Sequence, residues 1–373
     1  MTLSFEQGPI RPPSEAASLL LRLTRNCPWN KCAFCRSYHG QTFSRRSVAE
    51  VKADIDTVAA ICDAVRRDSR SGAVDLGVLL KLQNEGSFQT FHVASWLYHG
   101  GKNVFFQDAN SLVMPAQDVV EILRYLKERL PWVERVTTYA RSSTLARKSV
   151  ADLTALGEAG LSRIHVGLES GSDAVLKMIN KGTTAKQHVE AGQRVKAAGI
   201  SLSEYIILGI GGKALGREHA LETANVLNQI NPNYIRIRSL TISKNTTLSA
   251  MAQSGVFVEE TDPEIIAGAR LLVENLAGIT SYVVSDHSLN LLEEVNGQLP
   301  EDQPALVAIY DRYLNLPEKD QLIFSLGKRW GLFRQLDDLY HPVNYPRVSA
   351  VYEKLQKEGT YRGTLTELKN LVL

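Results

Sequence analysis

Short apolar stretches alternate with amphipathic stretches along most of this chain, and this alternation restricts its fold more than any other feature. In the amphipathic stretches, apolar residues recur at three- and four-residue spacing, which is the pattern of a helix packed on one face. Strands that alternate with helices pair in parallel through right-handed crossovers. We therefore predict an α/β fold, a partial (β/α)6 TIM-like barrel.

The repeating units can be assigned to residue ranges. The expected strands are Ser18–Thr24, Asn103–Gln107, Arg135–Ala140, Arg163–Glu169, Ser201–Ile210 and Asn233–Ile242, with Ile279–Val284 as a candidate for a seventh. The expected helices are Ser47–Val65, Ala116–Leu130, Ser149–Gly160, Asp173–Ile179, Thr184–Ala198, Glu218–Gln229 and one that begins near Thr261. In such folds the reactive groups lie in the loops that follow the carboxyl ends of the strands.

Two regions break this rhythm. Residues 66–102 are expected to form a helical insertion between the first helix and the second strand. Residues 288–373 are expected to be helical, starting with the apolar stretch Leu289–Val295. We therefore predict a partial barrel over residues 1–285 and a helical C-terminal subdomain or cap over residues 286–373.

The loop after the first strand holds three of the four cysteines in the chain, Cys27, Cys32 and Cys35. Thiolates bind iron and zinc, and clustered thiols in a reducing compartment indicate a metal more than a disulfide framework. Three cysteines without a nearby fourth are an incomplete set for a four-iron cluster. One iron would then remain open to another ligand.

Two other metal sites are compatible with these cysteines. A structural zinc could be closed by His39 as the fourth ligand. A two-iron cluster of the plant ferredoxin type could use Cys62, because the C-x4-C-x2-C spacing followed by a later cysteine fits that type. However, Cys62 lies on the apolar stripe of a predicted helix, where cysteine commonly serves as a small core residue.

Composition narrows the possible partners. The formal net charge is only +2, whereas dedicated nucleic-acid binders usually carry a strongly basic face. The sequence has no apolar run long enough to span a membrane, and its first residues lack the pattern of a secretory signal. We expect a cytoplasmic protein that has no membrane partner and for which nucleic acid is an unlikely partner.

The cysteine loop, with Phe34 directly before its last cysteine, resembles that of the radical S-adenosylmethionine (radical SAM) superfamily. The likeness covers about residues 18–250 and includes "HVGLESGSDAVLKMINKGTT", "YIILGIGG" and "NYIRIRSLTISKNTTL". Within the superfamily, the chain is similar to the branch around anaerobic coproporphyrinogen dehydrogenase. It departs from the family in two places. The usual cysteine spacing is C-x3-C-x2-C, whereas this chain has C-x4-C-x2-C. "QDAN" (residues 107–110) stands where the family carries "GGE".

This resemblance implies a chemistry and its cofactors. Cys27, Cys32 and Cys35 would hold a [4Fe-4S] cluster whose fourth iron binds S-adenosylmethionine. The reduced cluster would cleave S-adenosylmethionine to a 5′-deoxyadenosyl radical, which abstracts hydrogen from a small-molecule substrate. Reduced flavodoxin or ferredoxin would donate the electron. The alternatives are a radical SAM enzyme that modifies RNA and an iron–sulfur electron carrier without catalytic activity.

The resemblance also suggests residues for the bound S-adenosylmethionine. The candidates lie in the loop or at strand ends, and they are Phe34, Asp108, Arg141, Glu169, Ser170, Gly209 and Gly211. Asp286 and His287 follow the candidate seventh strand, where a paired Asp and His could transfer a proton to or from substrate. An alternative for Asp286 or Ser285 is to cap a helix that begins just after them.

Overall fold

The structure is a computed structural model that describes residues 3–9, 11–68 and 74–371. The described chain forms two compact units. The first contains residues 1–30, 37–166 and 190–202, and the second contains residues 31–36, 167–189 and 203–373. Strands β6 (Leu161–Glu169) and β7 (Ser201–Leu208) and helix α8 (Ala185–Ala197) each have residues in both units.

The first unit carries four parallel strands in the order β1-β4-β5-β6. Its remaining strands are β1 (Leu19–Arg22), β2 (Thr24–Arg25), β3 (Ser44–Arg45), β4 (Asn103–Gln107) and β5 (Arg135–Ala140). Strands β2 and β3 pair with each other as an antiparallel ribbon. Most residues of β4 and β5 are buried, including the polar Thr137 and Thr138.

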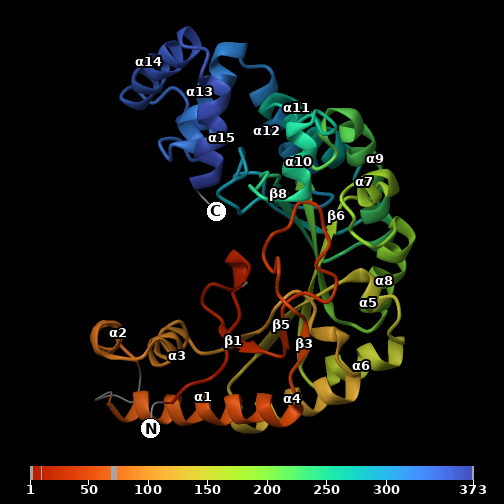
Figure 1. Cartoon of the computed structure of the whole chain (residues 1–373), viewed down its shortest axis with the longest axis vertical. Coiled ribbons are helices and arrows are strands. Elements are labelled where there is room, and N and C mark those ends of the chain that lie inside the picture. The colour runs from red at the N-terminus through yellow and green to blue at the C-terminus, as the bar shows by residue number, and fades with distance from the viewer. Residues whose placement is uncertain (1–2, 10, 69–73, 372–373) are drawn as a thin grey trace. The chain divides into compact units, whose positions relative to one another are not determined.

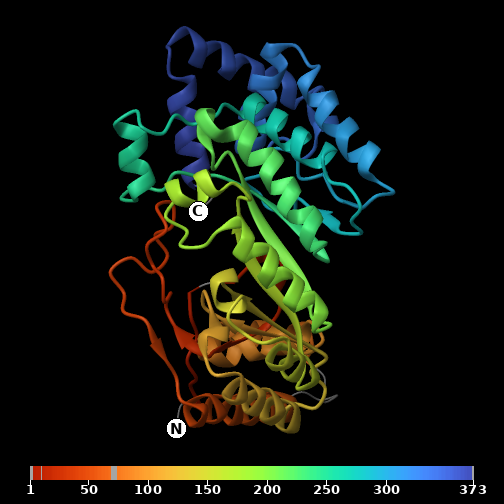
Figure 2. The ribbon, with the colours of Figure 1, turned by 90° about the vertical axis from the view of Figure 1, so that its right-hand side faces the viewer.

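Helices cover the sheet of the first unit. They are α1 (Val48–Asp68), α2 (Leu76–Glu85), α3 (Phe88–Tyr98), α4 (Ala116–Arg129), α5 (Ser142–Leu145) and α6 (Val150–Glu158), with 3-10 turns η1 (Pro13–Glu15) and η2 (Ser111–Val113). Helices α1 and α4 lie side by side (Figures 1 and 2), and α4 also packs on α6. Helix α6 begins with a capping box in which Ser149 and Asp152 satisfy each other's backbone N–H groups.

The second unit continues the parallel order with β7-β8-β9, and β10 pairs antiparallel to β9. These strands are β8 (Tyr234–Ser239), β9 (Tyr282–Val284) and β10 (Gly297–Gln298). The helices are α7 (Asp173–Met178), α9 (Gly212–Ile230), α10 (Thr247–Gln253), α11 (Asp262–Glu274), α12 (Gln303–Leu314), α13 (Glu318–Arg329), α14 (Asn344–Lys357) and α15 (Tyr361–Leu371), with the 3-10 turn η3 (Leu336–Asp338). Helix α11 packs between α9 and α12, and α13 contacts both α14 and α15.

The predicted α/β fold is confirmed. Strands β1, β4, β5, β6, β7 and β8 occur in chain order with helices in their crossovers, which is the topology of a partial (β/α)6 barrel. The predicted bounds of β4 and β5 are met, and the candidate seventh strand is shorter, at Tyr282–Val284. Helices α2 and α3 lie within the predicted insertion, whose residues 69–73 fall outside the described part of the chain. Residues 372–373 of the predicted C-terminal subdomain fall outside it as well.

One predicted helix is wrong. Leu289–Val295 forms turns instead of a helix, although Leu289, Leu291, Leu292 and Val295 are all buried. Side-chain hydrogen bonds replace the helical ones: Asn290 Nδ2 donates to the Ile237 carbonyl at 2.9 Å, and Asn296 Oδ1 accepts from the Ser285 N–H at 2.9 Å. Asparagine and serine bonds of this kind compete with helix formation. No helix in the described ranges is long and apolar enough to cross a membrane.

Candidate cofactor site

The first part of the cysteine loop is shaped by two asparagines. Asn26 and Asn30 both have positive φ, 70° and 48°, a backbone conformation that asparagine tolerates better than most residues. Their side chains fasten the loop to the segment after it. Asn26 Nδ2 donates to the Thr42 carbonyl at 2.6 Å, and Asn30 Nδ2 donates to the Tyr38 carbonyl at 2.6 Å. The Asn30 N–H points to the sulfur of Cys27 at 3.4 Å.

The second part of the loop belongs to the other compact unit and is held there by backbone hydrogen bonds. The Ala33 N–H donates to the Ile179 carbonyl at 2.8 Å, and the Ala33 carbonyl accepts from the Leu248 N–H at 2.8 Å. Phe34 is partly buried against the apolar cluster around Val175, which also contains Ala33. Phe34 therefore packs as a core residue of its loop.

The four cysteines differ in exposure. All four carry thiols; Cys27 and Cys32 are half-buried, and Cys35 is exposed. Cys62 is buried in α1, and burial raises the pKa of its thiol to about 12. A buried thiol of this kind is a core residue rather than a ligand. Within the described ranges, no three His, Cys, Asp or Glu side chains are arranged to hold a metal ion.

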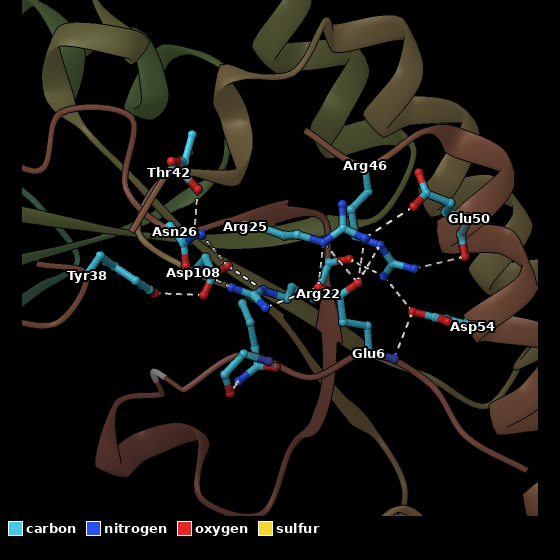
Figure 3. Close-up of polar contacts among 12 residues, drawn as sticks. Glu6, Arg22, Arg25, Asn26, Tyr38, Thr42, Arg46, Glu50, Asp54 and Asp108 are labelled. Carbon is cyan, nitrogen blue, oxygen red and sulfur yellow. Dashed lines mark hydrogen bonds and ion pairs between the residues drawn. The ribbon is translucent and has the colours of Figure 1, made fainter. Parts of the chain in front are cut away.

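Asp108 supports both ends of the cysteine loop (Figure 3). It follows β4, its φ is 71°, and its side chain is fully buried. Its Oδ2 accepts from Arg22 Nε at 2.6 Å and from the Asn26 N–H at 3.0 Å, and its Oδ1 accepts from the Tyr38 hydroxyl at 2.7 Å. Asn26 precedes Cys27 and Tyr38 follows Cys35, so one carboxylate binds the chain on both sides of the three cysteines.

The N-terminal segment covers the buried ion pair between Arg22 and Asp108. Glu6 binds Arg22 at 3.1 Å and Arg25 at 2.6 Å, as Figure 3 shows. The Gly8 N–H donates to Gln107 Oε1 at 2.7 Å, and Gln107 Nε2 donates to the Gly8 carbonyl at 2.9 Å. A Cβ at Gly8 would lie 2.6 Å from Asp108 Oδ1, so only glycine fits at this distance.

Arg141 lies over an aromatic ring of the cysteine loop. Its guanidinium carbon is 5.0 Å from the centre of the Trp29 ring, within the range of a cation–π interaction. Its backbone N–H donates to Asn110 Oδ1 at 3.1 Å, and Asn110 Nδ2 donates to Thr144 Oγ1 at 2.8 Å. The last residue of "QDAN" therefore fixes the start of α5, where Arg141 is the N-cap.

Glu169 ends β6 with a left-handed backbone, φ 61°. Its Oε1 accepts from Lys181 Nζ at 2.6 Å, and both side chains are largely buried. A Cβ at Gly167 would lie 2.2 Å from that same oxygen, so the glycine leaves room for the pair. Glu204 is buried nearby, where burial and the negative charge of Glu169 raise the pKa of its carboxyl well above the ordinary value.

Ser170 is buried against helix α9. Its hydroxyl lies 2.9 Å from His219 Nδ1 and accepts from the Ser172 N–H at 3.1 Å. Burial lowers the pKa of His219 to about 4, so the ring is neutral at pH 7. The next residue, Gly171, is as close to α9: a Cβ there would lie 2.2 Å from the Glu222 carbonyl oxygen. Ser170 is therefore part of a tightly packed contact with α9.

The glycines after β7 lie against other parts of the second unit. Gly209 has a φ of 81°, and a Cβ there would lie 3.3 Å from Ile265. Gly211 is the N-cap of α9. Gly212, with a φ of 57°, would place a Cβ 2.8 Å from both Phe257 and the Val258 carbonyl oxygen. The turn is glycine-rich because the chain around it is closely packed.

Asp286 and His287 follow β9 as predicted, but each has its own partners. The Asp286 carboxylate lies between Arg236 and Arg238, with both N–O distances 3.1 Å. His287 Nδ1 accepts from the Leu289 N–H at 3.2 Å. Burial, together with the positive charge of Arg238, lowers the pKa of His287. The alternative helix cap for Asp286 or Ser285 is wrong, because no helix begins there.

Sequence reasoning did not single out Arg22, Asn26 or Arg236. Arg22 ends β1 and Arg236 lies inside β8, and an arginine among apolar residues is the available signal: a buried charge needs a partner. Asn26 directly precedes Cys27, and an asparagine in a loop is a common sign of positive φ.

Part of the chain is similar to known protein families and structures. Residues 93–224 match the model of the radical SAM superfamily, a range that begins after the cysteine loop. A curated relative, the mitochondrial radical S-adenosyl methionine domain-containing protein 1 of Bos taurus, is 26% identical over 199 residues. This match covers 51% of the chain and 43% of the relative, so the chain spans less than half the length of that protein.

Two solved structures are similar at low identity. OxsB, a cobalamin-dependent S-adenosylmethionine radical enzyme with aqua-cobalamin and S-adenosylmethionine bound, is 14% identical with a TM-score of 0.47, covering 95% of this chain and 53% of that one. TsrM from Kitasatospora setae, a radical S-adenosylmethionine methyltransferase with cobalamin and a [4Fe-4S] cluster bound, is 13% identical with a TM-score of 0.44, covering 90% and 61%.

Proposed function

We propose that the chain is a radical SAM enzyme, because residues 93–224 match the model of that superfamily, and that Cys27, Cys32 and Cys35 hold the [4Fe-4S] cluster that its enzymes use with S-adenosylmethionine. We also propose that it abstracts hydrogen from a small-molecule substrate. The observation that carries the proposal is the loop itself: three thiols in nine positions, supported on both sides by the buried carboxylate of Asp108.

The donor set fits the proposed cluster. Three thiols on one loop are suitable iron ligands, and the fourth cysteine is out of reach inside α1. An incomplete set is what this chemistry requires, because the open iron binds the amine and carboxylate of S-adenosylmethionine. When bound, these cofactors supply reductive cleavage of the sulfonium and removal of hydrogen from the substrate. His39 is exposed, as Cys35 is, and it stays the predicted fourth ligand of the alternative zinc site.

Several residues of this chain are proposed to hold S-adenosylmethionine. Arg141 is suited to its carboxylate, because the guanidinium is presented over Trp29 beside Cys27. The carboxylate of Glu169 is suited to ribose hydroxyls or to the amino group, and Lys181 fixes its orientation. S-adenosylmethionine binding stays a prediction for Ser170, Phe34, Gly209 and Gly211. The contacts described above favour a structural role for each of them. Asp108 stays a prediction as ligand of the amine; its three internal donors support a positioning role instead.

The remaining assignments are also proposals. The small-molecule substrate, the reduced flavodoxin or ferredoxin donor and the branch near coproporphyrinogen dehydrogenase rest on the sequence resemblance. We propose the cytoplasm as the compartment, on the basis of clustered thiols that must stay reduced. The curated relative is described as mitochondrial.

The test is anaerobic reconstitution followed by addition of S-adenosylmethionine and dithionite. The proposal predicts 5′-deoxyadenosine; a simple electron carrier would yield none. Cys32→Ala should lose most of the bound iron, whereas Cys62→Ala, the matched control, should keep it. Full iron retention in Cys32→Ala, or loss in Cys62→Ala, would contradict the ligand assignment. A requirement for added RNA would favour the RNA-modifying alternative.

A further inference from the structure

Two arginines on β8 lie on the same face of the sheet as a tyrosine on β7. Arg236 and Arg238 are two positions apart, and β7 pairs with β8 so that Tyr205 is opposite Arg236. Their guanidinium carbons are 5.9 and 4.9 Å from the centre of the Tyr205 ring. The opposite face of the strands is apolar: Leu208 and Ile237 lie against Ile265 and Ile266 of α11. The arginines therefore lie on the face opposite the helices.

The two cations share one anion. Arg236 and Arg238 each bind a different oxygen of Asp286 at 3.1 Å, and their side chains are only 6% and 13% exposed. Two buried guanidinium groups against one carboxylate leave one positive charge in excess. Uncompensated charge is costly in a buried position, and an added anion relieves that cost.

Unused donors lie beside this excess charge. Arg236 Nε and Arg238 Nη2 are buried, and neither has a hydrogen-bond partner within the described part of the chain. A buried donor without an acceptor destabilises a fold unless something else supplies one. Guanidinium donors suit the oxygens of carboxylate and phosphate groups. The Asp286 side chain, which both arginines contact, is 37% exposed.

His287, the residue after Asp286, lies close enough to Arg238 for that positive charge to help lower the pKa of its ring. Its Nδ1 accepts from the Leu289 N–H, so in the neutral ring the proton is on Nε2. A neutral imidazole with a donor on Nε2 can contribute a hydrogen bond to an anion without adding a competing negative charge.

We propose that Arg236 and Arg238, which share Asp286, bind an oxyanion group of the substrate, either a carboxylate or a phosphate. This inference rests on the proposed function, because it names the chemical class of the small-molecule substrate that the proposed enzyme would act on. It also changes the role of Asp286. Rather than transferring a proton, Asp286 positions the two arginines. It binds one N–H donor group of each arginine and leaves Arg236 Nε and Arg238 Nη2 available to the substrate.

Equilibrium dialysis of the reconstituted protein at fixed ionic strength tests the proposal, with labelled succinate and labelled inorganic phosphate as separate probes. Arg238→Gln should weaken binding of the preferred probe by about tenfold or more. Arg312→Gln, an exposed arginine of the same unit, should not. Preference for succinate assigns a carboxylate, and preference for phosphate assigns a phosphate group. Wild-type binding that Arg238→Gln leaves unchanged, or no binding of either probe, would overturn the proposal.

Asp286→Asn provides a test that loss of folding cannot imitate. It removes the internal competitor while keeping both arginines, so the affinity for the probe should rise. Unchanged or weaker binding in a folded Asp286→Asn protein would contradict the proposal. If S-adenosylmethionine displaces the probe, the anion is the carboxylate of the cosubstrate and the substrate assignment is wrong. Failure of the proposed function would instead appear as absence of 5′-deoxyadenosine while arginine-dependent probe binding persists.

Discussion

The hydroxyl of Tyr38 donates a hydrogen bond to the carboxylate of Asp108 at 2.7 Å, joining the segment after Cys35 to the end of β4. The same carboxylate binds the backbone just before Cys27. Burial and the negative charge of Asp108 raise the pKa of Tyr38, so the phenol keeps its proton and remains the donor. A loop that must present three sulfurs is therefore restrained on both sides by one side chain.

Asp108→Asn should destabilise the protein and loosen the cysteine loop. Arg22 would lose the buried one of its two carboxylate partners and keep Glu6, so the cost should stay below the about 3–5 kcal/mol typical of a buried charge left unpaired. We expect a lower free energy of unfolding in urea and less iron retained after reconstitution. Tyr38→Phe removes one hydrogen bond only and should cost about 1–3 kcal/mol. If Asp108→Asn keeps its stability and iron but loses affinity for S-adenosylmethionine, Asp108 is the ligand of the amine instead.

Arg141→Gln should weaken binding of S-adenosylmethionine by about tenfold, because it removes a charged donor from the proposed carboxylate site. Trp29→Leu keeps the guanidinium and removes its aromatic support, which is worth about 0.5–1 kcal/mol at an exposed site. Its effect on affinity should therefore be smaller. Equilibrium dialysis with S-adenosylmethionine compares the two variants. Equal losses would mean that Arg141 acts by supporting the loop and not by binding.

Gly171→Ala should be destabilising by about 1–3 kcal/mol, because the added Cβ would lie 2.2 Å from a carbonyl oxygen of α9 and the helix would have to move. Gly268→Ala is the matched control. It lies inside α11 with nothing within 4 Å of the added Cβ, so it should stabilise the protein by about 0.5–1 kcal/mol. Urea unfolding measures both. A Gly171→Ala protein as stable as the unmodified protein would contradict the predicted clash with α9.

The buried carboxyl of Glu260 should make the free energy of unfolding decrease as the pH rises. Burial raises the pKa of its carboxyl to about 7 from an ordinary 4.5, and the charge of Glu264 adds to this against the opposing charge of Lys213. The folded chain therefore holds a proton that the unfolded chain releases between about pH 4.5 and 7. The free energy of unfolding should decrease over that window and level off above it.

Glu260→Gln should remove this contribution, altering the pH slope by at most about one proton. Urea unfolding at several pH values between 4.5 and 8 measures the slope, with Glu301→Gln, an exposed glutamate of the same unit, as the control. A slope that is the same in Glu260→Gln and in the unmodified protein would contradict the prediction.

The fold could be predicted because it depends on local patterns. The short strands β4 and β5 and the periodic helix α4 are encoded by neighbouring residues, and their bounds were predicted almost to the residue. Leu289–Val295 shows the limit of this approach. Its apolar spacing suits a helix, but Asn290 bonds to a strand 53 residues away and holds the segment in turns.

The candidate site was less predictable because its contacts are distant in sequence. Asp108 meets Arg22 and Tyr38 across 86 and 70 residues, so its position at the end of β4 indicated a functional site but not its partners. Asp286 was located correctly at the end of β9, yet its two arginines lie about fifty residues earlier. Local pattern identifies which residues reach a strand end; it does not identify which charges meet there.

The pairing of Gly8 with the Gln107 amide has a practical consequence for anyone preparing this protein. Trimming the first nine residues to obtain a shorter expression product would strip away the cover over Asp108 and admit water to its pair with Arg22. Hydration would weaken that attraction, and the sulfur-bearing loop would lose rigidity although no cysteine had been touched. A shortened product that binds iron poorly would then reflect the shortening and not the natural protein.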